Sequence, residues 1–271
     1  MTAPRLVATD LDGTLLRSDG SVSARTAAAL AACTGAGLEV VFVTARPPRW
    51  LVDVAAHVGP RGVAICINGA AVVEVATGRV LDERGMGAAQ VAELARRLRA
   101  AGGAVHLAVE RTAGFASERG YQGRHGVPPG SPAVDRIEEA LTASTLKLLV
   151  RADDAGEDLD AFVGRVARAV GSLAEVSHSR ADGLAEIAAP GVSKATALAR
   201  WTASLGIAAD EVWAVGDAPN DLPMLRWAGL GCAVANAHPD VLAAADRVLP
   251  SNEDDGVAVL LEDAMRVRGR A

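Results

Sequence analysis

Residues 8–16, ATDLDGTLL, place two carboxylates two positions apart, just after a short apolar segment. In an extended segment, residues i and i+2 share a face, so Asp10 and Asp12 are expected to be close neighbours. Neighbouring carboxylates repel each other and raise one pKa unless a cation neutralises them. Mg²⁺ prefers oxygen ligands and suits such a pair, and Gly13 permits a tight turn. An Asp-Gly turn with capping acids is the structural alternative.

Two further clusters have residue types that bind phosphate. In VFVTAR, Thr44 ends an expected strand, and Ala45 and Arg46 lead into an expected helix. A hydroxyl there can bind a phosphate oxygen beside backbone N–H groups, although Thr44 could simply cap the helix. In GVSKATAL, Lys194 falls in the first turn of an expected helix, where the helix dipole disfavours a cation. It therefore faces solvent or is held by an anion such as phosphate.

The fourth cluster is AVGDAPND, in which Asp217 ends an expected strand and Asn220 and Asp221 open a helix. Asp217 is placed to ligate the same ion as Asp10. Asn220 and Asp221 could hold the waters of that ion, a phosphate or Lys194. A turn followed by a helix cap is the alternative.

The elements that must position these residues alternate between strand and helix in the first 68 residues. Apolar strand-length runs occupy 5–10, 38–44 and 63–68, and helical patterns occupy 23–37 and 47–59. This order, with strands apolar on both faces, predicts a Rossmann-like parallel sheet covered by helices. Ligands of such sheets bind beyond the carboxyl ends of the strands, which is where all four clusters fall.

The middle of the chain follows a different pattern. A hairpin is expected over 70–83, helices over 88–103 and 157–170, strands over 104–110, 145–152, 173–179 and 183–189, and a loop over 111–135. After Pro190 the strand–helix alternation returns, with helices over 193–206, 220–229 and 256–268 and strands over 211–217 and 230–235. The prediction is an α/β core, 1–83 and 190–271, with an inserted α+β domain, 84–189.

Composition narrows the classes of function. The net charge of −6 argues against nucleic-acid binding, and no uncharged apolar run approaches the ~18 residues of a membrane span. The three cysteines stand far apart, which suits a reducing compartment. We therefore expect a cytoplasmic protein with no nucleic-acid or membrane partner, and a monomer or weak homodimer.

The order DxDGT, strand-terminal Thr, Lys and GDxxND resembles the haloacid dehalogenase-like (HAD) hydrolase superfamily, and more narrowly its Cof-type phosphatases of subfamily IIB. The phrases NGA (68–70) and LAEIAAPGVSKATAL (184–198) are also similar. The resemblance implies a Mg²⁺-dependent phosphatase of small phosphorylated metabolites, with sugar phosphates foremost, that forms an aspartyl-phosphate. It also implies that the inserted domain is a cap that selects the substrate.

The resemblance implies a role for each residue of the four clusters. Asp10 would be the nucleophile and Asp12 the general acid and base. Thr44 and Lys194 would hold phosphoryl oxygens, with Asn220 helping to position the phosphate and Asp221 supporting Lys194 or the metal shell. Asp10, Asp217 and the backbone carbonyl of Asp12 would bind Mg²⁺. Ala45 replaces the glycine usual in the family, from which we expect a slightly altered turn and unchanged chemistry.

Two other readings stay open at this point. A phosphomannomutase-like phosphotransferase shares these motifs and would pass phosphate to a sugar hydroxyl instead of water. A non-catalytic sensor of a phosphorylated metabolite would keep the binding residues, but it would not need both Asp10 and Asp12.

Overall fold

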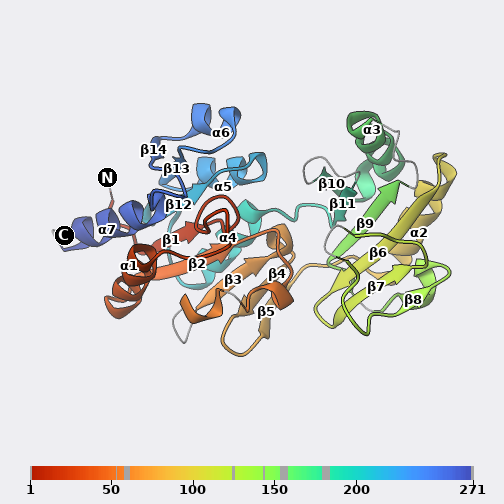
Figure 1. Ribbon diagram of the computed structural model, residues 1–271, viewed down its shortest axis with the longest axis horizontal. Coiled ribbons are helices and arrows are strands. Elements are labelled where there is room, and N and C mark those ends of the chain that lie inside the picture. Colours follow the sequence, from red (N-terminus) through yellow and green to blue (C-terminus); the bar gives the residue numbers. More distant parts are fainter. Residues whose placement is uncertain are drawn as a thin grey trace. The chain divides into compact units, whose positions relative to one another are not determined.

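The computed structural model describes residues 2–52, 54–57, 62–123, 126–142, 144–152, 158–178 and 184–269. The chain divides into two compact units (Figure 1). One combines Met1–Asp82 with Ser193–Ala271, and the other comprises Glu83–Val192. Each unit has its own sheet. Among the described residues, no helix is both long enough and apolar enough to cross a membrane.

The first unit is built on an eight-stranded sheet in the order β14-β13-β12-β1-β2-β3-β4-β5. Neighbours from β14 to β3 are parallel, and β4 is antiparallel to β3. Because Thr9 is level with both Val215 and Phe42, the carboxyl ends of β1, β12 and β2 meet at one edge. The strands are β1 (Leu6–Thr9), β2 (Glu39–Val43), β3 (Val63–Cys66), β4 (Ala71–Glu74), β5 (Arg79–Glu83), β12 (Val212–Gly216), β13 (Leu230–Val234) and β14 (Arg247–Leu249).

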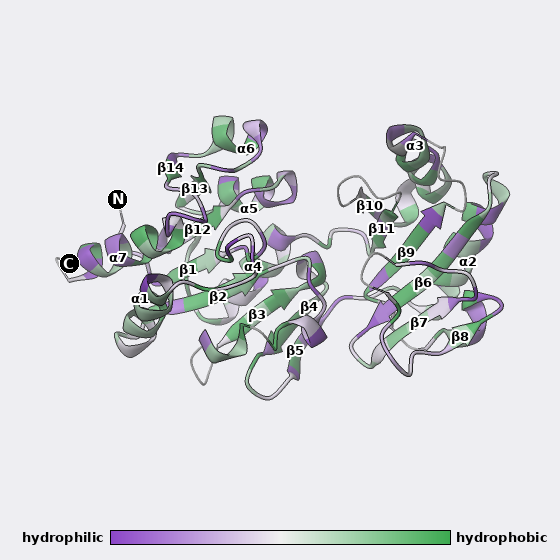
Figure 2. Ribbon diagram, viewed as in Figure 1, coloured by the Kyte–Doolittle hydropathy of each residue, from purple (hydrophilic) through white to green (hydrophobic). Residues whose placement is uncertain are grey.

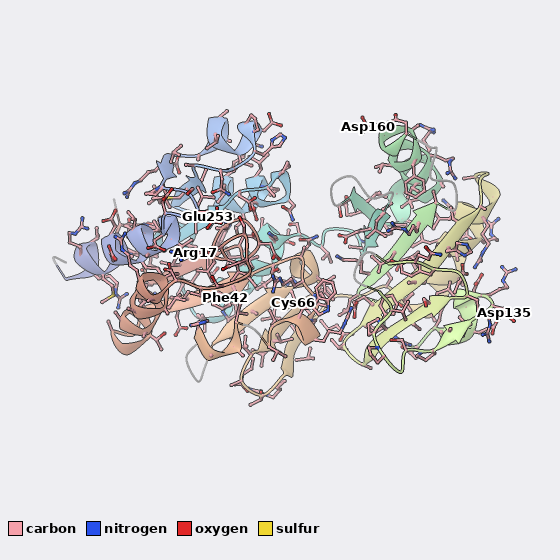
Figure 3. The ribbon with its side chains drawn as sticks, in the orientation of Figure 1. Arg17, Phe42, Cys66, Asp135, Asp160 and Glu253 are labelled. Carbon is pink, nitrogen blue, oxygen red and sulfur yellow. The ribbon has the colours of Figure 1, made fainter. Side chains whose placement is uncertain are left out.

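Helices flank this sheet, with α1 packed beside α7 and α4 beside α5 (Figure 1). Their bounds are α1 (Ala24–Gly35), α4 (Lys194–Ser204), α5 (Leu222–Trp227), α6 (Pro239–Ala244) and α7 (Gly256–Arg268). The central strands are apolar along their length (Figure 2). Phe42 on β2 and Cys66 on β3 are both fully buried (Figure 3), as expected for strands covered on both faces.

The helix expected over 47–59 is wrong. The described part of this segment holds two short 3₁₀ turns, Pro48–Trp50 and Ala55–His57, and residues 53 and 58–59 lie outside the described residues. The amides of Trp50, Leu51 and Val54 bond to carbonyls three positions back. Two successive prolines supply no N–H donors, which favours such tight turns over a regular helix.

The second unit has a six-stranded sheet in the order β10-β11-β9-β6-β7-β8. Its strands are β6 (Val105–Arg111), β7 (Gly114–Glu118), β8 (Ala133–Val134), β9 (Lys147–Ala152), β10 (Glu175–His178) and β11 (Leu184–Ala188). Apolar residues of α2 (Ala88–Ala100) and α3 (Leu159–Val170) form one buried cluster with side chains from one face of this sheet.

The loop expected over 111–135 is also wrong in part, because it contains β7 and β8. The chain turns directly after β6, and β7 pairs antiparallel to it with Arg111 opposite Gly114. Gly114 has φ 127°, a conformation that residues with a side chain rarely adopt. The small and polar residues of β7 concealed this hairpin, because they lack the apolar alternation that marks a strand.

Candidate active site

Asp10 follows the last residue of β1 and is held at the sheet edge by its own backbone. Its amide donates to the carbonyl of Val215 on β12 (3.0 Å). The side chain is 7% exposed, and its Oδ1 accepts a hydrogen bond from Lys194 Nζ at 2.6 Å. Burial of a carboxylate is tolerated only with a charged or hydrogen-bonding partner. Lys194 therefore accounts for the position of Asp10 in the apolar edge of the sheet.

Lys194 is the first residue of α4, after a capping box in which Ser193 Oγ accepts from Thr196 N at 3.1 Å. Its side chain is almost fully buried, and its Nζ also donates to Asp221 Oδ1 at 2.7 Å. Of the two sequence-based interpretations of Lys194, contact with an anion is correct. The anions in the structure are two carboxylates.

Asp221 is fully buried and is the most constrained of the acidic groups. Its Oδ2 accepts from the amides of Asp217 (3.1 Å) and Ala218 (3.0 Å), while Oδ1 accepts from Lys194. A Cβ at Gly216 would lie 2.5 Å from Asp221 Cγ, so a side chain at position 216 would displace the carboxylate. The GD-x-x-ND segment thus folds back on itself to present Asp221 to Lys194.

Asp217 lies against the turn that follows β1. Thr14 Oγ1 donates to Asp217 Oδ1 at 2.9 Å. Gly13 has φ 80°, and a Cβ at this position would lie 2.7 Å from Asp217 Oδ2. The carbonyl of Gly13 accepts from Asn236 Nδ2 at 2.7 Å. Gly13 is required both for the left-handed turn and for the close approach of Asp217.

The carboxylates of Asp10, Asp217 and Asp221 have oxygens within 4.8 Å of one another. Burial raises the pKa of Asp10 to about 8, against the pull of Lys194 and with the help of the two other carboxylates. Burial lowers the pKa of Lys194, but its two carboxylate partners outweigh burial and raise the pKa above its usual value. Three carboxylates lie close together, one ammonium bonds to two of them, and all the candidate ligand atoms are oxygens. This donor set fits Mg²⁺.

Asp12 has a different environment from Asp10. The chain turns at Leu11, whose side chain is fully buried. The Asp12 carboxylate is 59% exposed and accepts two hydrogen bonds from Arg46, from Nε at 2.8 Å and from Nη2 at 2.5 Å. Its carboxylate is not among the three that could hold a cation, whereas Asp221 is. Ligation through the Asp12 carbonyl stays a prediction.

Thr44 is buried at the carboxyl end of β2, next to β1 in the sheet. Its Oγ1 accepts from the amide of Arg46 at 3.1 Å, which closes a small turn across Ala45. Pro47 is the residue that precedes the following 3₁₀ turn, so Thr44 is not a helix cap. Asn220 is exposed, and its Nδ2 donates to Asn68 Oδ1 at 3.1 Å.

Three further residues lie at this edge, and the sequence motifs predict no role for them. Thr14 bonds to Asp217, Asn68 bonds to Asn220, and Asn236 holds the carbonyl of Gly13. Asn68 and Asn236 follow β3 and β13 closely, and the rule that located Asp10 and Thr44 would also have selected them. Thr14 belongs to the DGT motif itself.

Comparison with known proteins identifies the relatives of this chain. The family model for haloacid dehalogenase-like hydrolases matches residues 7–261. Pyridoxal phosphate phosphatase YbhA of Escherichia coli is 29% identical, over 94% of this chain and 96% of its own length. BT1666 of Bacteroides thetaiotaomicron, from a study of phosphatases of the superfamily, has a TM-score of 0.79 and 26% identity, covering 96% of this chain and 95% of its own. The subclass IIB sugar phosphatase BT4131 shares the fold, with a TM-score of 0.75 at 22% identity, covering 95% of this chain and 98% of its own.

Proposed function

The chain belongs to the Cof-type branch of the haloacid dehalogenase-like hydrolases, and from this premise we propose that it is a Mg²⁺-dependent phosphatase of small phosphorylated metabolites. The observation that carries the proposal is the buried group of Asp10, Lys194 and Asp221, with Asp217 within 4.8 Å of both aspartates. Such concentrated charge at a sheet edge is costly for stability and is typical of a catalytic site.

In the proposed reaction, an Asp10 carboxylate oxygen forms a bond to phosphorus while the bond from phosphorus to the ester oxygen breaks. The leaving alkoxide takes its proton from Asp12, which must first exchange Arg46 for the leaving group. Asp12 then accepts a proton from a water whose oxygen forms a bond to phosphorus, while the bond from phosphorus to the Asp10 oxygen breaks, which releases phosphate and regenerates the Asp10 carboxylate. The products are one alcohol and one phosphate for each ester and water consumed.

Lys194 and Thr44 are proposed to hold the phosphoryl oxygens, and Asn220 to orient them. Asp10 and Asp217, with the carbonyl of Asp12, would bind Mg²⁺, which would offset the charge of the phosphoryl group so that a carboxylate can approach phosphorus. Lys194 already donates a hydrogen bond to Asp10. It can therefore contact a phosphoryl group that becomes bonded to Asp10.

We propose that the inserted domain, 84–189, selects the leaving group. Support comes from the face of its sheet that lies opposite the helices. Lys147 is 6% exposed and forms an ion pair with Glu186 at 2.8 Å, and Glu110 stands opposite Lys147 in the strand register. Phe115 on β7 and Tyr121, which lies three residues after that strand, pack together with Ala108 and Leu149, with the two ring centroids 6.0 Å apart. The two glutamates can accept hydrogen bonds, Lys147 can donate them, and the aromatic rings offer an apolar surface. Such a face suits a leaving group with many hydroxyls, such as a sugar.

Two further polar residues of this domain, Arg119 and His106, have different surroundings. Arg119 pairs with Asp135 at 2.8 Å on an exposed surface, and His106 lies on β6 opposite Arg151. Arg124 and His125, which are polar residues of the loop expected over 111–135, lie outside the described residues. A cytoplasmic location stays part of the proposal. In its support, Cys33, Cys66 and Cys232 are all buried free thiols.

The experiment that tests the function is phosphate release from a panel of phosphomonoesters with Mg²⁺. Wild type is compared with Asp10→Asn, and EDTA serves as a second control. The proposal expects turnover by wild type with Mg²⁺ and loss of activity in both controls. Phosphate release by the Asp10→Asn variant, or phosphate release by wild type in EDTA, would contradict the proposal. Transfer of phosphate to an added sugar instead of water would favour the phosphotransferase.

A further inference from the structure

We infer that the turn after β3, residues 67–69, is a further positioning element of this site, and that Asn68 acts through Asn220 to orient the phosphoryl group. The inference rests on the proposed phosphatase function. It concerns residues to which neither the motifs nor the comparisons assign a role.

The backbone of this turn has positive φ at three successive residues, the first of which is β-branched. Ile67 and Asn68 both have φ 52°, and Gly69 has φ 106°. A β-branched residue is rarely found in the left-handed region, because its Cβ meets the following carbonyl. A chain segment keeps such a conformation only where the surrounding structure imposes it. The contacts of the turn must therefore be what holds it.

Those contacts reach two of the loops that carry the proposed phosphate ligands. The amide of Asn68 donates to the carbonyl of Thr44 at 3.0 Å, and the amide of Ile67 donates to the carbonyl of Arg46 at 3.1 Å. On its other side, Gly69 packs against the residue before Lys194. A Cβ at Gly69 would lie 2.3 Å from the Ser193 carbonyl oxygen. The turn thus fixes the spacing between the Thr44 loop and the start of α4.

The Asn68 side chain makes the third contact, by accepting from Asn220 Nδ2 at 3.1 Å. Glycine would adopt the left-handed conformation of Asn68 with less strain. The presence of asparagine instead of glycine suggests that the side chain has a function. Its hydrogen bond to Asn220 is that function. An amide restrained by one hydrogen bond has fewer orientations to lose when it donates to a phosphoryl oxygen. Asn68 is on this account a positioning residue and does not touch the substrate.

The test is a double-mutant cycle on the binding of inorganic phosphate, read by titration calorimetry of the full chain with Mg²⁺. The variants are Asn68→Gly, Asn220→Ala and the double variant. Asn68→Gly removes the amide and places at position 68 a residue that adopts positive φ without steric cost, so the variant should fold about as stably as wild type. Asp255→Gly is the matched control, because Asp255 has a similar φ of 61° but lies at the start of α7, paired with Arg17.

We expect Asn68→Gly and Asn220→Ala each to weaken phosphate binding by about tenfold, and the double variant to be no weaker than Asn220→Ala alone. Asp255→Gly should bind as wild type does. If Asn68→Gly binds phosphate as tightly as wild type, or if the two effects multiply, the inference is wrong while the proposed function stands. If wild type itself binds no phosphate, both are wrong.

Discussion

At the scale of the residue, the site depends on one buried ammonium shared by two buried carboxylates. Lys194 donates to Asp10 and Asp221, and all three side chains are nearly or wholly inaccessible to solvent. A buried ion pair adds little net stability, but removal of one partner leaves an uncompensated charge in a medium of low polarity. Substitution within this group should therefore change both the stability of the fold and the proposed reaction.

Lys194→Met tests that link. The substitution keeps the apolar stem and removes the charge, so Asp10 and Asp221 lose their shared partner. We expect the free energy of unfolding in EDTA to fall by about 3 kcal/mol or more, together with loss of phosphate release. Arg200→Met on the same helix is the control. Arg200 pairs with Asp82 at 3.2 Å, both side chains are 35% exposed, and the expected cost is below about 1 kcal/mol. Equal costs in urea unfolding would refute the assignment.

The binding of Mg²⁺ should depend on pH through Asp10. Burial raises the pKa of Asp10 from 3.8 to about 8 in the absence of a metal ion. Below that pH the carboxyl group holds a proton that Mg²⁺ must displace, so apparent affinity should rise about tenfold per pH unit up to pH 8 and then level off. Calorimetry at pH 7 in buffers of different ionisation enthalpy should detect release of about one proton. Asp10→Asn should release none.

The free energy of unfolding of the metal-free protein should fall as pH rises, whereas the Mg²⁺ affinity should increase. Between the unfolded pKa of 3.8 and the folded pKa of about 8, the folded state binds the extra proton. The contribution of Asp10 to stability is therefore lost as pH rises through this window. A contribution that grew toward pH 8 in EDTA, measured as wild type minus Asp10→Asn, would contradict the raised pKa.

At the scale of the element, the site depends on turns that follow β1, β2, β3 and β12. The turn after β1 needs glycine for two reasons that can be separated. Gly13 and Gly20 have nearly the same φ, 80° and 81°, but a Cβ at Gly13 meets Asp217 Oδ2 at 2.7 Å, whereas a Cβ at Gly20 has no heavy atom within 4 Å. A residue with a side chain would therefore be strained at both positions, but only at position 13 would it also contact the Asp217 carboxylate.

Gly13→Ala should therefore weaken Mg²⁺ binding by about tenfold or more, through displacement of Asp217. Gly20→Ala should lower the melting temperature to a similar degree through strain, and it should leave Mg²⁺ affinity unchanged. Titration of both variants with Mg²⁺, beside thermal melts, separates the two effects. Equal Mg²⁺ affinity in both variants would show that Asp217 does not require the close approach.

The sequence predicted the elements that carry the site better than those that do not. Strands buried on both faces gave long apolar runs, and Asp10, Thr44 and Asp217 follow β1, β2 and β12 as expected. The segment after Thr44 was misjudged because its apolar spacing suits a helix, while Pro47 and Pro48 favour 3₁₀ turns. The different environments of Asp10, which is buried, and Asp12, which is exposed, depend on a turn at Leu11 that hydrophobic periodicity does not predict. The contact between Asn68 and Asn220 joins residues 152 positions apart.

At the scale of the whole molecule, the proposed chemistry belongs to one unit and the proposed selection of the substrate to the other. The core, Met1–Asp82 with Ser193–Ala271, holds every residue of the proposed chemistry. The unit Glu83–Val192 has its own sheet and its own apolar cluster. Substitutions in the two units should therefore change different kinetic quantities.

Lys147→Met should change the ranking of substrates. We expect kcat/KM for the best natural ester to fall by about tenfold or more, because Glu186 loses its partner and a donor is lost from the face opposite the helices. The fall for p-nitrophenyl phosphate, which has no hydroxyls to recognise, should be smaller. Arg119→Met is the matched control, since the Arg119–Asp135 pair is exposed. An equal fall in kcat/KM for all esters would show that Lys147 does not take part in substrate selection.

The measurement that tests the central claim most directly is chemical trapping of the covalent intermediate. Wild type is mixed with Mg²⁺ and its best substrate, treated with borohydride during turnover, and digested for peptide mass spectrometry. Borohydride reduces an acyl phosphate to an alcohol, so an aspartyl-phosphate at Asp10 becomes homoserine. The account predicts homoserine at position 10 in wild type with substrate, and unmodified Asp10 when substrate is omitted. Rapid phosphate release with position 10 unmodified, or modification at another aspartate, would contradict it.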